Sequence, residues 1–360
     1  MSQGKRILLY SASLFVGLFF LFTGVVEAKG FLAPLLTAII LALLALPLSK
    51  IMEKSGIGRG FASFLTTFVL LLFSLGFIWL ISFQIRSFVA DWPEIKETMT
   101  PKLEDFKSYV FEHTPLTEND LDKSMEGEAI PFIGSAGETG TMALGFFSKT
   151  LGFLGTYFLV FIYIFFLLNY RTKFKNFIVM FFRENKKKEV KEVVDKSGTV
   201  VQQYLVGRLL LMLFLAIVYS IGLGISGVDN FILVSLIAAF LTLIPVVGNI
   251  VGFTLAMALS YLSTGDTSAL IGIIITFSIA QLLEDYVLQP FIIGDKVDLH
   301  PFFVILVVIM GSALWGVIGM ILAIPIMAII TIISLHVPAL HPFGYLFSKK
   351  GKQKKNKNGK

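Results

Sequence analysis

The stretch EDYVLQPFIIGDKVDLHP, Glu284 to Pro301, decides the fold, because it lies between apolar segments at residues 268–283 and 302–333. Both flanking segments are interpreted as membrane spans. The stretch therefore places ionisable side chains at or near membrane depth, where each costs about 2.5–3.5 kcal/mol or more and is a functional candidate. These side chains are Glu284, Asp285, Asp295, Asp298 and His300.

The same stretch contains three residues that predict a break in the helix. Pro290 and Pro301 lack a backbone donor, and Gly294 permits a bend. Irregular backbone near a membrane is tolerated only where protein or a water-filled cavity satisfies its polar groups. The sequence therefore predicts a loop that lines such a cavity.

Composition assigns the whole chain to the membrane. Of its 360 residues, 56% are apolar and 15% are charged, and the mean hydropathy is +0.82. A soluble domain has about 45–50% apolar and about 25% charged residues. We therefore expect an all-α polytopic integral membrane protein. The chain has no cysteine, which excludes disulfides, thiolate metal sites and a cysteine nucleophile.

About eight hydrophobic segments divide the chain. They cover residues 7–26, 31–48, 61–82, 142–168, 209–226, 231–262, 268–283 and 302–333. The expected organisation is three transmembrane segments in 1–82, an extracytoplasmic insertion in 83–141, a fourth transmembrane segment in 142–168, a basic cytoplasmic segment in 169–207, a motif-bearing transport region in 208–333 and a basic cytoplasmic tail in 334–360.

The two polar regions indicate the orientation. Apolar residues recur at helical spacing from Ile85 to Val110, which predicts that the third span continues as an amphipathic helix, bent at Pro93 or Pro101. Its apolar stripe packs either on the same chain or on a neighbouring subunit. Residues 169–208 carry ten Lys/Arg against four Asp/Glu. This charge follows the positive-inside rule, so both termini are predicted to be cytoplasmic and no nucleic-acid partner is needed to explain it. Arg208, at the start of a span, is expected to reach the headgroups.

Two of the apolar segments are too long for one ordinary span. Residues 231–262 contain the break PVVGNIVG, and residues 302–333 contain GVIGMILAIP. If each is a single crossing, the chain crosses eight times; if each is a re-entrant hairpin, it crosses six times. Both topologies keep the termini inside, but they place the Glu284 stretch on opposite sides. The predicted hinge and break residues are Pro245, Gly248, Gly252, Pro290, Gly294, Pro301, Gly316, Gly319 and Pro325.

Three motifs make the sequence resemble the autoinducer-2 exporter family of bacterial membrane proteins, the PerM-like permeases. They are P-x-x-G-x-x-x-G at Pro245 to Gly252, the Glu284 to Pro301 pattern E-x-x-x-x-x-P-x-x-x-G-x-x-x-x-x-H-P, and G-x-x-G-x-x-x-A-x-P at Gly316 to Pro325. The resemblance covers about residues 1–345. It implies a transporter of the bacterial inner membrane, associated with export of autoinducer-2 and in some members with sodium/proton antiport, that forms homo-oligomers, in some cases pentamers.

The candidate site residues are those that offer charge or hydrogen bonds near the predicted breaks. They are Glu284, Asp285, Gln281, Asn249, Thr254, His300 and Asp298. Two adjacent carboxylates in a low-dielectric site repel each other, which favours protonation of one and makes proton coupling chemically feasible. Asn249 and Thr254 either bind a polar substrate or cation or satisfy freed backbone groups. His300 either titrates during transport or starts the last helix.

The sequence thus supports three functional hypotheses. The first is a secondary transporter that exports a small polar solute, with autoinducer-2 as the solute implied by the resemblance and H⁺ or Na⁺ as the coupling ion. The second is a sodium/proton antiporter, and the third is a membrane scaffold or regulator that transports nothing. No enzyme, cofactor or metal site is predicted, since the chain has no HExxH, no Walker A motif and no G-x-S-x-G elbow. Membrane lipids are expected partners.

Overall fold

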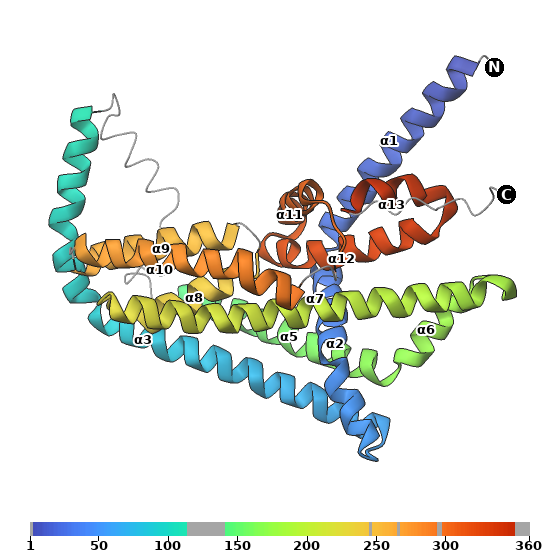
Figure 1. Cartoon of the computed structure of the whole chain (residues 1–360), viewed down its shortest axis with the longest axis horizontal. Coiled ribbons are helices and arrows are strands. Elements are labelled where there is room, and N and C mark those ends of the chain that lie inside the picture. Colours follow the sequence, from blue (N-terminus) through green and yellow to red (C-terminus); the bar gives the residue numbers. More distant parts are fainter. Residues whose placement is uncertain (1–2, 114–140, 245–246, 265–266, 294–296, 350–360) are drawn as a thin grey trace. The chain divides into compact units, whose positions relative to one another are not determined.

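The computed structural model describes residues 3–113, 141–244, 247–264, 267–293 and 297–349 (Figure 1). All regular secondary structure in these ranges is helical. The chain divides into two compact units. Unit 1 comprises Met1–Ser74, Phe158–Leu211 and Glu284–Lys360, and unit 2 comprises Leu75–Tyr157 and Met212–Leu283.

Three helices, α3 (Arg59–His113), α5 (Thr141–Asn169) and α7 (Glu184–Ile225), contribute residues to both units. Unit 1 also contains α1 (Gln3–Glu27), α2 (Lys29–Lys54), α6 (Arg171–Met180), the π-helix η1 (Glu284–Ile293), α11 (Pro301–Trp315), α12 (Val317–His336), the 3-10 turn η3 (Pro338–Leu340) and α13 (His341–Phe347). Unit 2 also contains α8 (Phe231–Leu241), α9 (Val247–Thr264) and α10 (Thr267–Leu283).

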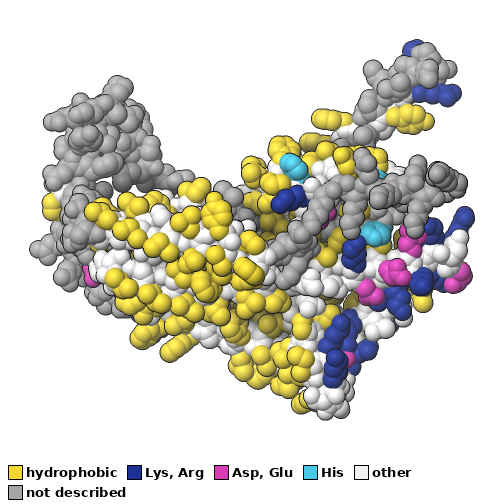
Figure 2. All heavy atoms as spheres, viewed as in Figure 1, with side chains coloured by type: hydrophobic (Ala, Val, Ile, Leu, Met, Phe, Trp, Pro, Cys, Tyr) yellow, Lys and Arg dark blue, Asp and Glu magenta, His cyan; other side chains and the backbone are white. Residues whose placement is uncertain are grey.

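The predicted all-α polytopic membrane class is confirmed. In the described ranges, five helical stretches are long and apolar enough to cross a membrane: Lys29–Lys54, Arg59–Gln84, Glu184–Ile225, Ala269–Ile292 and Val317–His336. Leu154–Asn169 and Arg171–Met180, which are bent by 69° at their junction, make a sixth if they are counted as one span. Figure 2 shows apolar side chains covering much of the visible surface, as a protein in contact with lipid requires.

The long block at residues 231–262 is a helical hairpin. The two helices α8 and α9 run antiparallel, because Gly248 lies against Leu241 while the later Gly252 lies against the earlier Ala238. A Cβ atom added to Gly248 would lie 1.8 Å from the carbonyl oxygen of Leu241. Only a glycine permits this approach.

The second long block, at residues 302–333, has the same construction. α11 and α12 are joined at Gly316, whose φ of 63° and ψ of −139° suit glycine. A Cβ atom added to Gly319 would lie 1.9 Å from the carbonyl oxygen of Gly311, so the two backbones touch. Each block therefore contains two antiparallel helices and is not one continuous helix. The number of crossings stays a prediction, since α12 alone is long and apolar enough to span a membrane. The side of the membrane to which each hairpin returns stays a prediction.

The predicted helix break at Pro290 is wrong. α10 continues directly into η1, a π-helix of 10 residues with Pro290 inside it. In an α-helix the proline ring would clash with the carbonyl four residues earlier. The wider turn of a π-helix, whose hydrogen bonds join residues five apart, moves that carbonyl away from the ring. The segment Glu284–Ile293 is therefore helix, and the described residues 297–300, just before α11, are not helical.

A similar fusion occurs in α7. The sequence predicts a cytoplasmic helix from about Glu184 to Leu205 followed by a span at 209–226. The structure has one helix of 42 residues across both. α3 runs from Arg59 to His113, which confirms the prediction that the third span continues as a helix beyond residue 82.

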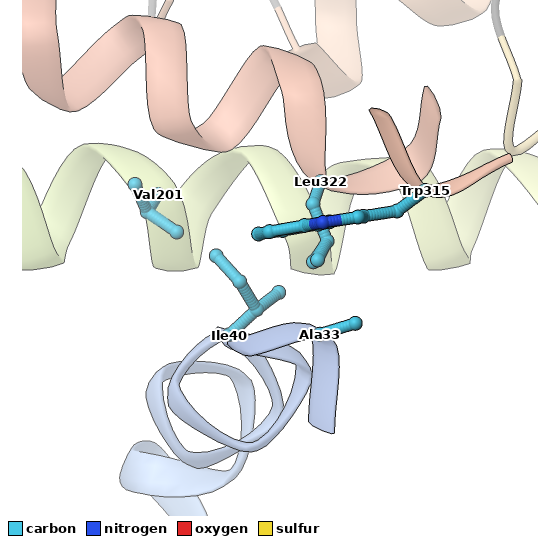
Figure 3. Close-up of a cluster of buried hydrophobic side chains, with 5 residues drawn as sticks. All are labelled: Ala33, Ile40, Val201, Trp315 and Leu322. Atoms are coloured by element: carbon cyan, nitrogen blue, oxygen red, sulfur yellow. The ribbon is translucent and has the colours of Figure 1, made fainter. Parts of the chain in front are cut away.

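A buried apolar cluster holds the α11–α12 hairpin in unit 1. It consists of Ala33 and Ile40 from α2, Val201 from α7, Trp315 from α11 and Leu322 from α12. Figure 3 shows the Trp315 ring above the α2 side chains Ile40 and Ala33, with Leu322 overlapping the ring in this view. The indole N–H donates a hydrogen bond of 3.0 Å to the carbonyl oxygen of Val25, at the end of α1.

Unit 2 is held by aromatic and small residues. Tyr219 of α7 stacks on Phe277 of α10 with 4.5 Å between the ring centroids, and Phe253 of α9 meets the same Phe277 edge-on at 5.5 Å. One turn after Tyr219, Gly222 lies so close to Thr276 that an added Cβ would be 2.3 Å from its methyl group. Two helices, α7 and α9, therefore pack against the same part of α10.

The glycine contact of the second hairpin is testable. We expect Gly319→Ala to destabilise the protein by about 1–3 kcal/mol, because the added methyl forces the hairpin backbones apart. Gly30→Ala is the matched control, since nothing lies within 4 Å of a Cβ there and alanine is the better helix former. Thermal unfolding of the detergent-solubilised protein measures both. Equal stability of the two variants would contradict the close packing.

Candidate functional site at a buried ion pair

Glu284 and Arg208 form a buried ion pair in unit 1. Glu284 is the first residue of η1, and its side chain is 3% exposed. Arg208 lies on α7, and its side chain is 8% exposed. The Arg208 Nη1 donates to Glu284 Oε1 at 3.3 Å. The structure thus brings together two charges that are 76 residues apart in sequence.

Arg208 does not have the environment that its sequence position predicts. We expected it to reach the headgroups from the start of a span, but it is buried, as is Tyr204 one turn earlier. An arginine stays charged under all ordinary conditions. A buried guanidinium therefore requires an anionic partner, and Glu284 supplies one.

Gln289 joins the two adjacent carboxylates. Its Nε2 lies 3.5 Å from Glu284 Oε1 and donates to Asp285 Oδ1 at 3.2 Å. Because the hydrogen bonds of a π-helix join residues five apart, Gln289 lies one turn after Glu284, on the same side of η1. Asp285 itself is exposed, so the two carboxylates do not share one buried site as the sequence predicts. Glu284 is the member of this pair that the protein encloses.

A second polar contact lies inside unit 2. Asn249 of α9 donates through Nδ2 to Gln281 Oε1 of α10 at 2.7 Å. Thr254 does not join them; it is exposed, and its hydroxyl donates to the carbonyl oxygen of Ile250 on its own helix. Two of the predicted candidates therefore form a direct amide–amide contact between neighbouring helices, and the third satisfies local backbone.

His300 and Asp298 connect the residues before α11 to the end of α13 in unit 1. The His300 ring caps α11, because its Nδ1 accepts from the Phe302 N–H at 3.3 Å, and its own backbone N–H donates to the Phe347 carbonyl oxygen at 2.8 Å. The Ser348 hydroxyl donates to Asp298 Oδ2 at 2.5 Å. These contacts attach the end of α13 to the residues before α11. They favour the interpretation of His300 as the start of the last hairpin.

The predicted hinge residues have different roles. Gly248, Gly252 and Gly319 allow helix backbones to approach, and Gly316 forms the turn between α11 and α12. Pro301 is the first residue of α11, and Pro325 is buried within α12. Pro245, Gly294 and Asp295 lie outside the described residues. The predicted water-filled cavity beside this stretch stays a prediction.

Sequence reasoning missed three partners of the site. Arg208 carries a usable signal, since it is a lone cation in the apolar run LVGRLLLMLF and a charge there needs a partner. Gln289 carries no such sequence signal, because its contact with Glu284 depends on the π-helical winding of η1. Ser348 had none either, since it lies 50 residues from Asp298.

Comparison with known proteins identifies the family. Residues 11–339 match the model of a family described as "AI-2E family transporter". The chain belongs to the AI-2E transporter family. It is a multi-pass membrane protein of that family, and the match includes both hairpins and the Arg208–Glu284 pair.

Several curated AI-2E relatives match over shorter ranges. "Putative transport protein YrrI" of Bacillus subtilis is 30% identical over 41% of this chain and 40% of its own length. "Putative transport protein YueF" of the same organism is 32% identical over 41% and 39%, and "Putative transport protein MT0215" of Mycobacterium tuberculosis is 35% identical over 30% and 29%. The chain thus spans about two fifths or less of the length of these curated relatives.

The ion pair predicts a specific pattern of stability. We expect Arg208→Gln and Glu284→Gln each to destabilise the protein by about 3–5 kcal/mol, because each leaves one buried charge uncompensated. The double variant is expected to lose less than the sum of the two losses. Thermal unfolding in detergent of the wild-type protein, the two single variants and the double variant completes a double-mutant cycle. This cycle measures the interaction energy between Arg208 and Glu284.

Asp285→Asn is the control for this cycle. It removes the neighbouring carboxylate, which is exposed, and should change stability by about 0.5 kcal/mol or less. Additive losses in the cycle would show that Arg208 and Glu284 do not interact in the folded protein.

Proposed function

We propose that this protein is a secondary transporter that exports a small polar solute, with the Arg208–Glu284 pair as its charge-coupling element. The buried ion pair is the observation that carries the proposal. An apolar helical protein gains no stability from enclosing two charges, since their desolvation offsets their attraction. Ionisable groups at membrane depth mark substrate and ion pathways, and membership of the AI-2E transporter family supports a role in transport.

Protonation of Glu284 would couple a proton to a change of structure. Arg208 cannot release its proton, so neutralising Glu284 leaves a buried guanidinium without a counter-charge. That state favours any rearrangement that hydrates Arg208 or brings it an anion. Glu284 is also the first residue of the π-helix, an element that is frequent at functional sites. The proposal is that loss of the ion pair allows η1 to change its winding and open the pathway.

The solute and its setting belong to the proposal as well. Autoinducer-2 is the solute that the family resemblance suggests; it is a small polar diol that amide groups such as Asn249 and Gln281 suit by hydrogen bonding. We place the protein in the bacterial inner membrane as a homo-oligomer, a pentamer being one form. The basic segment at 169–207 and the lysine-rich tail support cytoplasmic termini.

Reconstituted protein tests the coupling directly. A pH jump across proteoliposomes that contain a pH-sensitive dye, with and without sodium, is followed by autoinducer-2 uptake in the same vesicles. We expect uptake that is coupled to proton movement, and we expect Glu284→Gln to reduce it to the rate of protein-free vesicles because the proton site is lost. Asp229→Asn, which neutralises an exposed carboxylate in the turn before α8, is the matched control and should keep the wild-type rate.

The other outcomes separate the competing functions. Proton movement that requires sodium and ignores autoinducer-2 would indicate a sodium/proton antiporter. Silence of the folded wild-type protein in both assays would favour the scaffold or regulator hypothesis. Unchanged pH dependence in Glu284→Gln would remove the ion pair from the mechanism.

A further inference from the structure

α6 and the beginning of α3 enclose a basic pocket in unit 1. Its volume is about 480 Å³, and its lining includes two cationic side chains, Arg59 and Lys173, with the amides of Asn169 and Asn176. The rings of Tyr170 and Phe177 complete the wall. The pocket thus combines positive charge, amide donors and aromatic surface.

The pocket carries surplus positive charge. Its neighbouring carboxylate, Glu53, is already neutralised by Arg171, whose two guanidinium nitrogens lie 2.5 and 2.7 Å from its oxygens. The Arg59 Nε is 4.0 Å from Glu53 Oε2, beyond hydrogen-bond distance, and the Arg59 Nη1 donates to the Thr172 hydroxyl at 3.1 Å. Among the residues that the structure describes, Lys173 has no ion-pair partner. Two cationic groups therefore remain for an external anion.

The aromatic surface of α6 indicates where this anion comes from. No residue of α6 is buried, and Phe174, Phe177 and the adjoining Phe181 are 49%, 58% and 74% exposed. Exposed phenylalanines beside lysine and arginine are typical of a helix in the membrane interface. α6 is also turned 69° from the end of α5, so the two do not form one straight helix.

The distribution of charge in this part of unit 1 agrees. Figure 2 shows Lys and Arg side chains gathered over the end of α2, α6 and the start of α7. Within residues 169–183 the charged residues are Arg171, Lys173, Lys175 and Arg183, all basic. Lys175 is paired with Asp195 at 2.5 Å, so Lys173 is the lysine of α6 that faces the pocket unpaired.

We propose that this pocket binds the phosphate headgroup of an anionic membrane lipid, with α6 lying in the headgroup region. The Arg59 guanidinium would supply paired hydrogen bonds to phosphate oxygens, and Lys173 would add a point charge. Asn169 and Asn176 can donate to the glycerol or to the remaining oxygens. The exposed phenylalanines would lie among the acyl chains next to the headgroup, which a soluble anion does not provide.

Lipid binding to the full chain tests this proposal without any transport assay. Native mass spectrometry of the detergent-solubilised protein titrated with phosphatidylglycerol or phosphatidylcholine gives the affinity for each lipid. We expect Arg59→Gln/Lys173→Gln to weaken phosphatidylglycerol binding about thirtyfold, which is what two basic side chains contribute at an anionic surface. Phosphatidylcholine binding should stay unchanged.

The matched control is Lys188→Gln/Lys191→Gln, which removes the same charge from two exposed lysines of α7. It should change phosphatidylglycerol binding about threefold or less, as charge outside the pocket contributes only long-range attraction. A second comparison uses single substitutions, in case the double variant fails to fold. It compares Lys173→Glu in the pocket with Lys188→Glu on α7 outside the pocket. We expect the same contrast between these two.

Three results would overturn the proposal. Equal losses in the pocket and control variants would show diffuse attraction without a site. Displacement of phosphatidylglycerol by inorganic phosphate, beyond the effect of sodium chloride at equal ionic strength, would identify a site for a soluble anion. Equal binding of both lipids to the wild-type protein would show that the pocket does not recognise anionic headgroups.

Discussion

The buried ion pair of Arg208 and Glu284 is the constraint on which the rest of this structure depends. It attaches the middle of α7 to the residue where α10 becomes η1. A charge enclosed by apolar helices has few alternatives, because separation leaves each partner without solvation. The pair therefore fixes which residue of α7 faces η1 and places Glu284 at the start of the π-helix. Gln289 then follows at the π-helical spacing and contacts both neighbouring carboxylates.

Each of the two units contains one helical hairpin, α11–α12 in unit 1 and α8–α9 in unit 2. In each, glycine brings two backbones into direct contact, at Gly248 in α9 and at Gly319 in α12. Association of helices within lipid depends on such close packing, because apolar side chains gain little from leaving one apolar medium for another. Trp315 then ties the second hairpin to α1 and α2 through its hydrogen bond to Val25 and its apolar contacts. Glycines thus allow close packing within each hairpin, and Trp315 attaches one hairpin to α1 and α2.

Polar interactions of unit 1 fall into two classes that suit two functions. The Arg208–Glu284 pair is buried, so separating the two charges is energetically costly, and we propose that this pair is the charge-coupling element. The Glu53–Arg171 and Lys175–Asp195 pairs are partly or largely exposed, and pairs of this kind contribute little stability. These two pairs neutralise Arg171 and Lys175. Arg59 and Lys173 are therefore the cationic side chains that we propose bind a lipid phosphate. The same side-chain types therefore have opposite roles according to burial.

The sequence by itself determined the membrane class, the family and most helices, because apolar length, charge distribution and the spacing of Pro and Gly are local properties. It also singled out Glu284, since a carboxylate at the end of an apolar segment is conspicuous. Only the tertiary structure decided that Arg208 is its partner and that Asp285 is exposed, because both depend on which helix faces Glu284. It likewise decided that Pro290 lies within a π-helix and that both long segments fold back at their glycines. These outcomes depend on backbone winding and on contacts between distant residues, which periodicity along one chain does not encode.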